Sequence, residues 1–238
     1  MARFVLVHGA WHNGELLEPV AKSIRQAGHQ VYLPTLKGNG HSDDKLVGLP
    51  DVIASLDDYI RSSELTDFVL VGHSYGGMVI TGIADRMPQR IRRLVYWNAF
   101  VPNNGESLLD MVPQYKELFA SLRQPDGSIT LPYEIWRESF INDVDAAMAK
   151  ACYKQLNAHP YNTFIDKSKT TANPAKMTIA KSYINSTEDT ALPQSLGWHP
   201  RLSEKLGLFR LVQLSGSHEV CFSNPKLIAS KIIDAGRD

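Results

Sequence analysis

The fold is decided by residues 68–84, which read FVLVGHSYGGMVITGIA. Residues 68–71 form a short apolar run that predicts a buried strand, and residues 77–84 predict a buried helix. Between them, residues 72–76 fit the pattern Gly-x-Ser-x-Gly, whose small residues let a strand and a helix approach closely. Such a strained turn holds the Ser74 hydroxyl clear of the backbone, at a helix N-terminus whose dipole favours negative charge. The setting predicts that Ser74 is a nucleophile.

Length, charge and cysteine content narrow the class of protein. A chain of 238 residues suits one domain, or one domain with an insertion. The formal net charge of +0 favours neither a nucleic acid nor an anionic membrane surface as a partner. The two cysteines, Cys152 and Cys221, make neither a disulfide framework nor a metal site. The first residues enter a strand-like run without the layout of a signal peptide, and no apolar stretch is long enough to span a membrane, so we expect a cytoplasmic protein.

Strand and helix patterns alternate along most of the chain. We expect strands at residues 3–8, 30–34, 68–71, 92–97, 177–184 and 208–214. We expect helices at residues 15–27, 50–61, 77–84 and 225–235. This alternation predicts a mostly parallel central sheet with helices on both faces.

Residues 101–175 break this rhythm. They contain helical patterns at residues 107–122, 132–142 and 144–156, but no clear strand. We interpret them as a helical cap (lid) inserted over the carboxyl ends of the strands, where open α/β sheets bind their ligands. The predicted organisation is a core of residues 1–100 and 176–238, with the cap inserted in the same domain.

A serine nucleophile requires a base, because its hydroxyl is weakly reactive near neutral pH. When the serine lies on such a strand–turn–helix unit, the acid and then the histidine follow it along the chain. Of the eight histidines, His159, His199 and His218 fulfil this order. His218 comes after the last expected strand and a Ser-Gly-Ser turn, just before the last helix. We therefore predict His218 as the base.

The acid is expected after the strand at residues 177–184. Two adjacent carboxylates follow it, and we favour Asp189, with Glu188 as the alternative. A further interpretation is that both acids cap a helix beginning near Pro193. Some enzymes place the acid after an earlier strand, but that position holds Asn98, which has no carboxylate.

An oxyanion hole requires two backbone N–H groups directed at the developing negative charge. We predict Tyr75, directly after the nucleophile, and Ala10, in the loop after the first strand. His8 and His12 of this loop lie four residues apart, but no acid or cysteine lies nearby in sequence, so we expect them to shape the loop. No metal and no organic cofactor is expected.

Four motifs resemble the α/β-hydrolase superfamily over nearly the whole chain. The motifs are His8-Gly9-Ala10-Trp11-His12, Gly72-His73-Ser74-Tyr75-Gly76-Gly77, Thr187-Glu188-Asp189 with Leu192-Pro193, and Ser217-His218 with Ser223-Asn224-Pro225. Within the superfamily they are similar to the plant methylesterase and hydroxynitrile lyase group and its bacterial esterase relatives. The resemblance implies the α/β-hydrolase fold, a triad of Ser74, Asp189 and His218, and a helical cap over an apolar pocket.

Two positions separate the branches of this group. Plant hydroxynitrile lyases carry a threonine in the loop near Ala10 and a lysine directly after the catalytic histidine. This chain has Gly9 and Ala10 in the loop, and Glu219 follows His218. A lysine would stabilise departing cyanide, whereas a carboxylate would repel it, so ester hydrolysis is favoured.

The expected function is therefore hydrolysis of a small carboxylic ester, lactone or thioester through an acyl-enzyme. Non-hydrolytic use of the same triad, as in a lyase or a cofactor-free dioxygenase, stays an alternative, as does a ligand-binding receptor on this fold. The candidates for lining the pocket are Trp11, Tyr75, Phe100, Trp136, Phe140 and Met111, although core packing is the favoured interpretation for each. The expected partner is the small ester, with no nucleic acid and no membrane, and a homodimer stays open.

Overall fold

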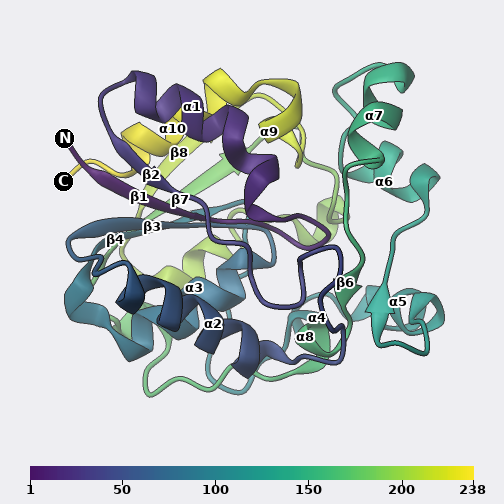
Figure 1. Ribbon diagram of the computed structural model, residues 1–238, viewed down its shortest axis with the longest axis horizontal. Helices are drawn as coiled ribbons and strands as arrows, with labels where there is room; N and C mark the ends of the chain where they lie inside the picture. The colour runs from purple at the N-terminus through teal and green to yellow at the C-terminus, as the bar shows by residue number, and fades with distance from the viewer.

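Six parallel strands form the centre of the molecule, which the computed structural model describes over residues 1–238 (Figure 1). The strands are β1 (Arg3–Val7), β2 (Gln30–Tyr32), β3 (Phe68–His73), β4 (Ile91–Trp97), β7 (Ala180–Ser186) and β8 (Arg210–Leu214). They lie in the order β2-β1-β3-β4-β7-β8, and every neighbouring pair is parallel. β3 is buried along its whole length, which explains its continuous apolar sequence.

Helices cover both faces of this sheet, as the alternating pattern predicts. The covering helices are α1 (Glu18–Gln26), α2 (Leu49–Ser62), α3 (Gly76–Arg86), α9 (Val220–Ser223) and α10 (Pro225–Ala235). α1 and α10 pack together on one face, and α2 and α3 pack together on the other (Figure 1). Clusters of 19 and 48 buried hydrophobic residues fill the two interfaces, and the larger cluster continues into residues 101–175.

The ends of several elements differ from the sequence pattern. The helix expected at residues 15–27 divides into a 3-10 turn, Gly14–Leu17, and α1, because Asn13 caps the turn by accepting from the Leu16 amide. The strand expected from residue 177 begins at Ala180, since Pro174–Lys176 form another 3-10 turn. Further 3-10 turns are Pro88–Arg90, Pro113–Tyr115, Gln194–Leu196 and Ser203–Leu206.

Residues 101–175 form short helices beside the sheet, at the right of Figure 1. These helices are α4 (Leu108–Met111), α5 (Lys116–Leu122), α6 (Tyr133–Ser139), α7 (Ala146–Tyr153) and α8 (Asn162–Ile165). The expectation that this segment contains no strand is wrong, because β5 (Ser128–Ile129) pairs with β6 (His159–Pro160) in an antiparallel sheet. Two residues per strand are too few to produce a periodic pattern in the sequence.

The strand order places two loops next to each other at the centre of the sheet. β1 is followed in sequence by its neighbour β2, whereas the next strands, β3 and β4, lie on the other side of β1. The loops that leave the carboxyl ends of β1 and β3 therefore diverge and leave a crevice, which is where open α/β sheets bind ligands. The β1 loop contains Ala10, and the β3 loop contains Ser74.

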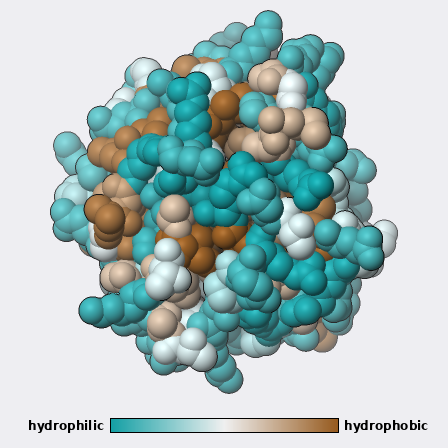
Figure 2. All heavy atoms as spheres, turned by 90° about the vertical axis from the view of Figure 1, so that its left-hand side faces the viewer, coloured by the Kyte–Doolittle hydropathy of each residue, from teal (hydrophilic) through white to brown (hydrophobic).

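The face opposite residues 101–175 is covered mainly by hydrophilic side chains, with hydrophobic ones between them (Figure 2). Folded proteins commonly expose such scattered apolar groups, so this face indicates no ligand. Among the helices, none combines the length and the apolar character that crossing a bilayer requires.

Candidate active site

Ser74 lies in the sharp turn between β3 and α3. Its φ of 54° is in the left-handed region, where a residue with a Cβ is strained. A Cβ on Gly72 would lie 2.8 Å from the carbonyl oxygen of Gly76. A Cβ on Gly77 would lie 2.1 Å from the carbonyl oxygen of Phe100. The glycines around Ser74 are thus required by close backbone approach, which explains the motif in steric terms.

Asp189 and His218 form a buried contact. His218 Nδ1 donates to Asp189 Oδ2 over 2.6 Å, and their side chains are 1% and 0% exposed. Asp189 Oδ1 accepts from the Ala191 amide at 2.8 Å. Glu188, the alternative acid, accepts from the Ser215 hydroxyl instead. The geometry therefore places Asp189 rather than Glu188 against the imidazole, and neither acid caps the 3-10 turn at Gln194–Leu196.

Asn98 also binds the Asp189 carboxylate, a role that no sequence pattern indicated. Its Nδ2 donates to the same oxygen, Oδ2, that accepts from His218. Its Oδ1 accepts from the Ser186 amide at 2.8 Å, which fixes the orientation of the carboxamide. Asn98 is fully buried and has a φ of 38°. The position after β4, which has no carboxylate, thus holds a donor that orients Asp189.

Aromatic rings enclose the His218 imidazole. Trp198 stacks on it with a centroid distance of 5.1 Å, and Phe140 meets it edge-on at 5.2 Å. The His73 ring lies behind it at 4.7 Å, and His73 Nε2 donates to the His218 carbonyl at 3.1 Å. Burial holds the pKa of His73 well below its usual value. A neutral His73 thus packs against the ring of His218.

The other two histidines of the expected order are engaged elsewhere. His159 contacts the Asn39 carboxamide and the Thr163 hydroxyl, and His199 contacts the Ser203 hydroxyl. No hydrogen bond joins Ser74 Oγ to His218 in this structure; such contacts commonly tighten only when substrate is bound.

The two predicted oxyanion donors lie on either side of Ser74. Ala10, Ser74 and Tyr75 line one cavity, and neither the Ala10 nor the Tyr75 amide donates a hydrogen bond within the chain. The Gly9 backbone is pressed against the nucleophile, since a Cβ on Gly9 would lie 3.2 Å from the Ser74 Cβ. Both amides are therefore free to bind a ligand oxygen next to Ser74.

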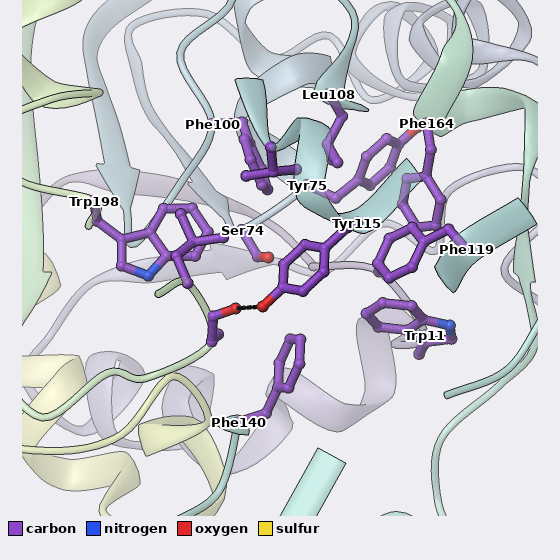
Figure 3. Close-up of a pocket in the computed structure, with 14 residues that line it drawn as sticks. Trp11, Ser74, Tyr75, Phe100, Leu108, Tyr115, Phe119, Phe140, Phe164 and Trp198 are labelled. Carbon is purple, nitrogen blue, oxygen red and sulfur yellow. Dashed lines mark hydrogen bonds between the residues drawn. The ribbon is translucent and has the colours of Figure 1, made fainter. Parts of the chain in front are cut away.

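The cavity beside Ser74 is small and almost entirely apolar (Figure 3). It is lined by Ala10, Trp11, Ser74, Tyr75, Phe100, Leu108, Val112, Tyr115, Phe119, Phe140, Phe164, Ala191, Leu192 and Trp198. Its volume of about 30 Å³ is far below the roughly 300 to 1,000 Å³ of a typical ligand pocket. No charged side chain reaches it, so its lining suits an uncharged ligand.

Trp11, Tyr75, Phe100 and Phe140 line this cavity, whereas Trp136 and Met111 do not, in accord with the interpretation that favoured core packing. Trp136 is fully buried and packs against Tyr153, with a ring-centroid distance of 5.7 Å, because its face of α6 is turned toward α7. Met111 Sδ instead lies 3.5 Å from Lys205 Nζ, outside the lining. An apolar side chain in this segment can fill the core or line the cavity, and the same residue types serve both purposes. The sequence therefore does not distinguish the two.

Tyr115 closes the cavity. Figure 3 shows its ring between Ser74 and Phe119, with its hydroxyl directed at the loop that follows Asp189. The hydroxyl donates to the Ala191 carbonyl at 2.7 Å, and the ring stacks on Phe119 with an interplanar angle of 3°. This bond joins residues 101–175 to the loop that follows Asp189.

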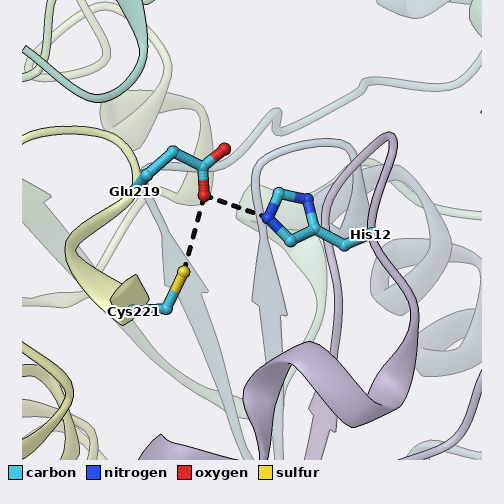
Figure 4. Close-up of side chains that lie close together, drawn as sticks. All are labelled: His12, Glu219 and Cys221. Carbon is cyan, nitrogen blue, oxygen red and sulfur yellow. Dashed lines mark hydrogen bonds and ion pairs between the residues drawn. The ribbon is translucent and has the colours of Figure 1, made fainter. Parts of the chain in front are cut away.

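A second polar cluster lies behind the site and unites His12, Glu219 and Cys221 (Figure 4). His12 Nε2 and Glu219 Oε2 are 3.0 Å apart, and the Cys221 thiol lies 3.5 Å from the same oxygen. Burial alone would lower the pKa of His12, but the Glu219 carboxylate outweighs it and raises the pKa. Burial would likewise raise the pKa of Glu219, yet His12 lowers it. These are ligand types that zinc accepts, and the contact between His12 and Glu219 occupies one nitrogen and one oxygen of the set.

Comparison with known proteins agrees with this geometry. The profile of the Alpha/beta hydrolase family matches residues 4–231. The chain belongs to this family. A carbendazim hydrolyzing esterase of Nocardioides sp. is 33% identical over 257 residues, covering 99% of this chain and 100% of the relative. An alpha-hydroxynitrile lyase of Arabidopsis thaliana is 23% identical over 249 residues, covering 94% of this chain and 92% of the relative.

Among solved structures, an extracellular alpha/beta-hydrolase from a Paenibacillus species superposes with a TM-score of 0.96. It is 37% identical, covers 100% of both chains, and is described as sharing structural and functional homology with tobacco salicylic acid binding protein 2. These relatives confirm the similarity to the methylesterase and hydroxynitrile lyase group. With relatives named esterase and pyrethroid hydrolase, the chain is a carboxylic ester hydrolase of the α/β type.

Proposed function

We propose that this enzyme hydrolyses small, uncharged carboxylic esters through a triad of Ser74, His218 and Asp189. The observation that carries the proposal is the buried contact between His218 Nδ1 and Asp189 Oδ2, next to a cavity that contains Ser74. A carboxylate on Nδ1 fixes the imidazole tautomer whose Nε2 can accept a proton, and it stabilises the imidazolium that results. The strained backbone of Ser74 presents its hydroxyl to the cavity.

In this mechanism, His218 accepts the Ser74 proton while Ser74 Oγ attacks the ester carbonyl carbon. The amides of Ala10 and Tyr75 donate to the carbonyl oxygen as it becomes negative. His218 then gives the proton to the leaving alcohol, and the acyl group stays on Ser74. Water, activated by His218, attacks this acyl-enzyme and releases the acid.

The lining of the cavity favours an aromatic or compact apolar acyl group. Trp11, Phe119 and Phe164 present ring faces and edges with no free charge to pair with a charged substrate. Aromatic ligands gain edge-to-face contacts with such rings. The relatives named carbendazim hydrolyzing esterase and pyrethroid hydrolase support hydrolysis as the reaction class.

Lyase chemistry is the alternative that the comparisons raise, through the hydroxynitrile lyase of Arabidopsis thaliana. The residue after His218 is Glu219, and its carboxylate faces His12 rather than the cavity. The cavity therefore offers no cation to hold a departing cyanide, and hydrolysis remains the proposal.

The test is hydrolysis of p-nitrophenyl acetate, p-nitrophenyl benzoate and methyl benzoate by the wild type, Ser74→Ala and Ser230→Ala. Ser230 is an exposed serine on α10 and serves as the control. We expect Ser74→Ala to lose at least about three orders of magnitude in kcat, and Ser230→Ala to equal the wild type. Turnover that survives in Ser74→Ala would contradict the proposal.

A further inference from the structure

In the loop formed by Gly9, Ala10, Trp11 and His12, every carbonyl oxygen accepts a hydrogen bond. The donors are His8 Nδ1 to Gly9 O at 2.9 Å, His12 Nδ1 to Ala10 O at 2.8 Å, Asn157 N to Trp11 O at 2.6 Å, and Asn39 Nδ2 to His12 O at 3.2 Å. The peptides of this loop are trans, so each N–H points away from the carbonyl of its own peptide. Binding the carbonyls therefore also fixes the direction of the amides. The Gly9 carbonyl, bound by His8, fixes the Ala10 N–H, and the Ala10 carbonyl, bound by His12, fixes the next peptide along the loop.

The two histidines of this loop act in different charge states. His8 Nδ1 donates to Gly9 O while its Nε2 accepts from the Leu36 amide at 3.1 Å, so the ring is neutral with one defined tautomer. Burial accordingly lowers the pKa of His8 to about 3. His12 instead has an acceptor at each nitrogen, Ala10 O at Nδ1 and Glu219 at Nε2, and is an imidazolium. The contact to Glu219 is an ion pair rather than a well-aligned hydrogen bond.

Glu219 belongs to a different loop, the one that carries His218 after β8. Its amide donates to the Phe140 carbonyl at 3.1 Å and to Ser217 Oγ at 3.2 Å, which anchors this loop independently. Its side chain crosses behind the site to His12 (Figure 4). No other hydrogen bond or ion pair joins residues 8–13 to residues 215–223. β1 and β8 are not neighbours in the sheet, so the sheet does not supply this link.

We propose that His12 and Glu219 are positioning residues that tie the loop of the general base to the loop of the oxyanion donor, holding His218 and the Ala10 amide in one arrangement around Ser74. The inference rests on the proposed function. The Cys221 thiol, kept protonated by a pKa that burial raises well above the usual value, donates to the same Glu219 oxygen and fixes its rotamer.

The link acts on the transition state more than on the bound substrate. When it is broken, the His12 ring loses its partner at Nε2, so its bond to the Ala10 carbonyl weakens and the peptides on either side of Ala10 can rotate away from the direction that the reaction requires. Loss of one oxyanion donor lowers kcat about 10²- to 10³-fold in serine hydrolases. The apolar cavity that binds the substrate does not contain His12 or Glu219, so KM should stay nearly unchanged.

The experiment compares the wild type with Glu219→Met, Glu219→Gln and Ile228→Ala. The carboxamide introduced by Glu219→Gln can donate to a neutral His12 and so retain the link without charge, whereas the thioether introduced by Glu219→Met cannot. Ile228→Ala truncates a buried α10 side chain that lies outside the cavity, and it serves as the control for a loss of stability. Each protein is measured for Tm, for kcat and KM with p-nitrophenyl benzoate, and for binding of benzoate and of phenyl trifluoromethyl ketone. Ser74 Oγ adds to the ketone carbon, its proton passes to His218, and the ketone oxygen becomes an oxyanion.

We expect Glu219→Met to lower kcat and affinity for the ketone about 100-fold, with KM and benzoate affinity within about two-fold. Glu219→Gln should recover to within about ten-fold of the wild type, and Ile228→Ala should lower Tm alone. If Glu219→Met does not fold, His12→Phe keeps the ring contact with Phe222 at 5.7 Å and carries the same expectation. Unchanged kcat and ketone affinity in the folded variant would overturn the inference. A wild type that forms no Ser74-dependent ketone adduct would instead overturn the proposed function.

Discussion

The two walls of the cavity at Ser74 are built from different interactions. On the sheet side, polar groups meet defined partners: the Asp189 carboxylate accepts from Asn98, His218 and Ala191, and the carbonyls of the Ala10 loop are all bound. On the side of residues 101–175, rings meet rings, as Phe119 meets Phe164 at a centroid distance of 5.2 Å. Among these rings, Tyr115 adds a hydrogen bond to the Ala191 carbonyl.

This difference suggests that the sheet side determines the chemistry, whereas the side of residues 101–175 determines which substrates fit. Hydrogen bonds have fixed lengths and directions, so the sheet side can hold reacting groups in one arrangement. Contacts between apolar rings depend weakly on direction, and cores tolerate changes that conserve volume. Substitutions on the sheet side should therefore change kcat for all substrates alike, and substitutions on the other wall should change the preference among them.

The strongest test of the sheet side is the pair of neighbouring acids. Asp189→Asn should lower kcat by about four orders of magnitude, since an amide in place of the carboxylate favours the wrong imidazole tautomer. Glu188→Gln, the matched control one residue away, should stay within about three-fold of the wild type, because Glu188 binds only the Ser215 hydroxyl. The measurement is kcat of both variants in steady-state kinetics with p-nitrophenyl acetate. A larger loss of kcat in Glu188→Gln than in Asp189→Asn would assign the role of the acid to Glu188.

The second test concerns Asn98. Asn98→Ala removes one donor from an ionised carboxylate, and hydrogen bonds to charged groups contribute about 1.5 to 3 kcal/mol. We expect kcat to fall about 10- to 100-fold with little change in KM, for acetate and benzoate esters alike. The control Asn185→Ala is a neighbouring asparagine on β7 whose side chain forms no hydrogen bond. Equal losses in both variants would mean that Asn98 acts only through stability.

Much of the sheet side could be predicted from the sequence because its geometry requires particular residue types at particular positions. The turn at Ser74 requires glycine at 72 and 77, since a Cβ at either position would collide with backbone. The buried strand β3 requires an apolar run, and the α10 start requires a capping side chain, Asn224, followed by proline. These features also located His218 between the last strand and the last helix.

Other features of the site require no residue type that a sequence pattern could identify. Asn98 orients Asp189 from a distance of 91 residues in sequence, and an asparagine after a strand has many other uses. Glu219 was interpreted by what a carboxylate would do in the cavity, whereas it faces His12 behind the site. Trp136 and Phe140 are aromatic residues four positions apart on one short segment, yet only Phe140 lines the cavity. These outcomes depend on the packing of α6 and α7, which no local pattern specifies.

The smallest expected effect tests the other wall, through Phe119→Leu. Phe119 is nearly buried and contacts Trp11, Tyr115 and Phe164, so a smaller side chain enlarges the cavity beside Ser74 without removing a polar contact. A change of this size in an apolar pocket contributes about 1 to 3 kcal/mol to discrimination. We expect kcat/KM for p-nitrophenyl benzoate relative to acetate to change about five- to ten-fold, while kcat for the acetate stays within about two-fold.

The matched control for this test is Phe209→Leu, the same chemical change at a half-buried position next to His199 and outside the cavity. It should leave the benzoate-to-acetate ratio unchanged. If Phe119→Leu instead lowers kcat for both esters equally, the ring positions the reacting groups through Tyr115 and the loop after Asp189, and the separation of the two walls fails at that hydrogen bond. The Tyr115→Phe variant then locates the coupling, because it removes only the hydroxyl that donates to the Ala191 carbonyl.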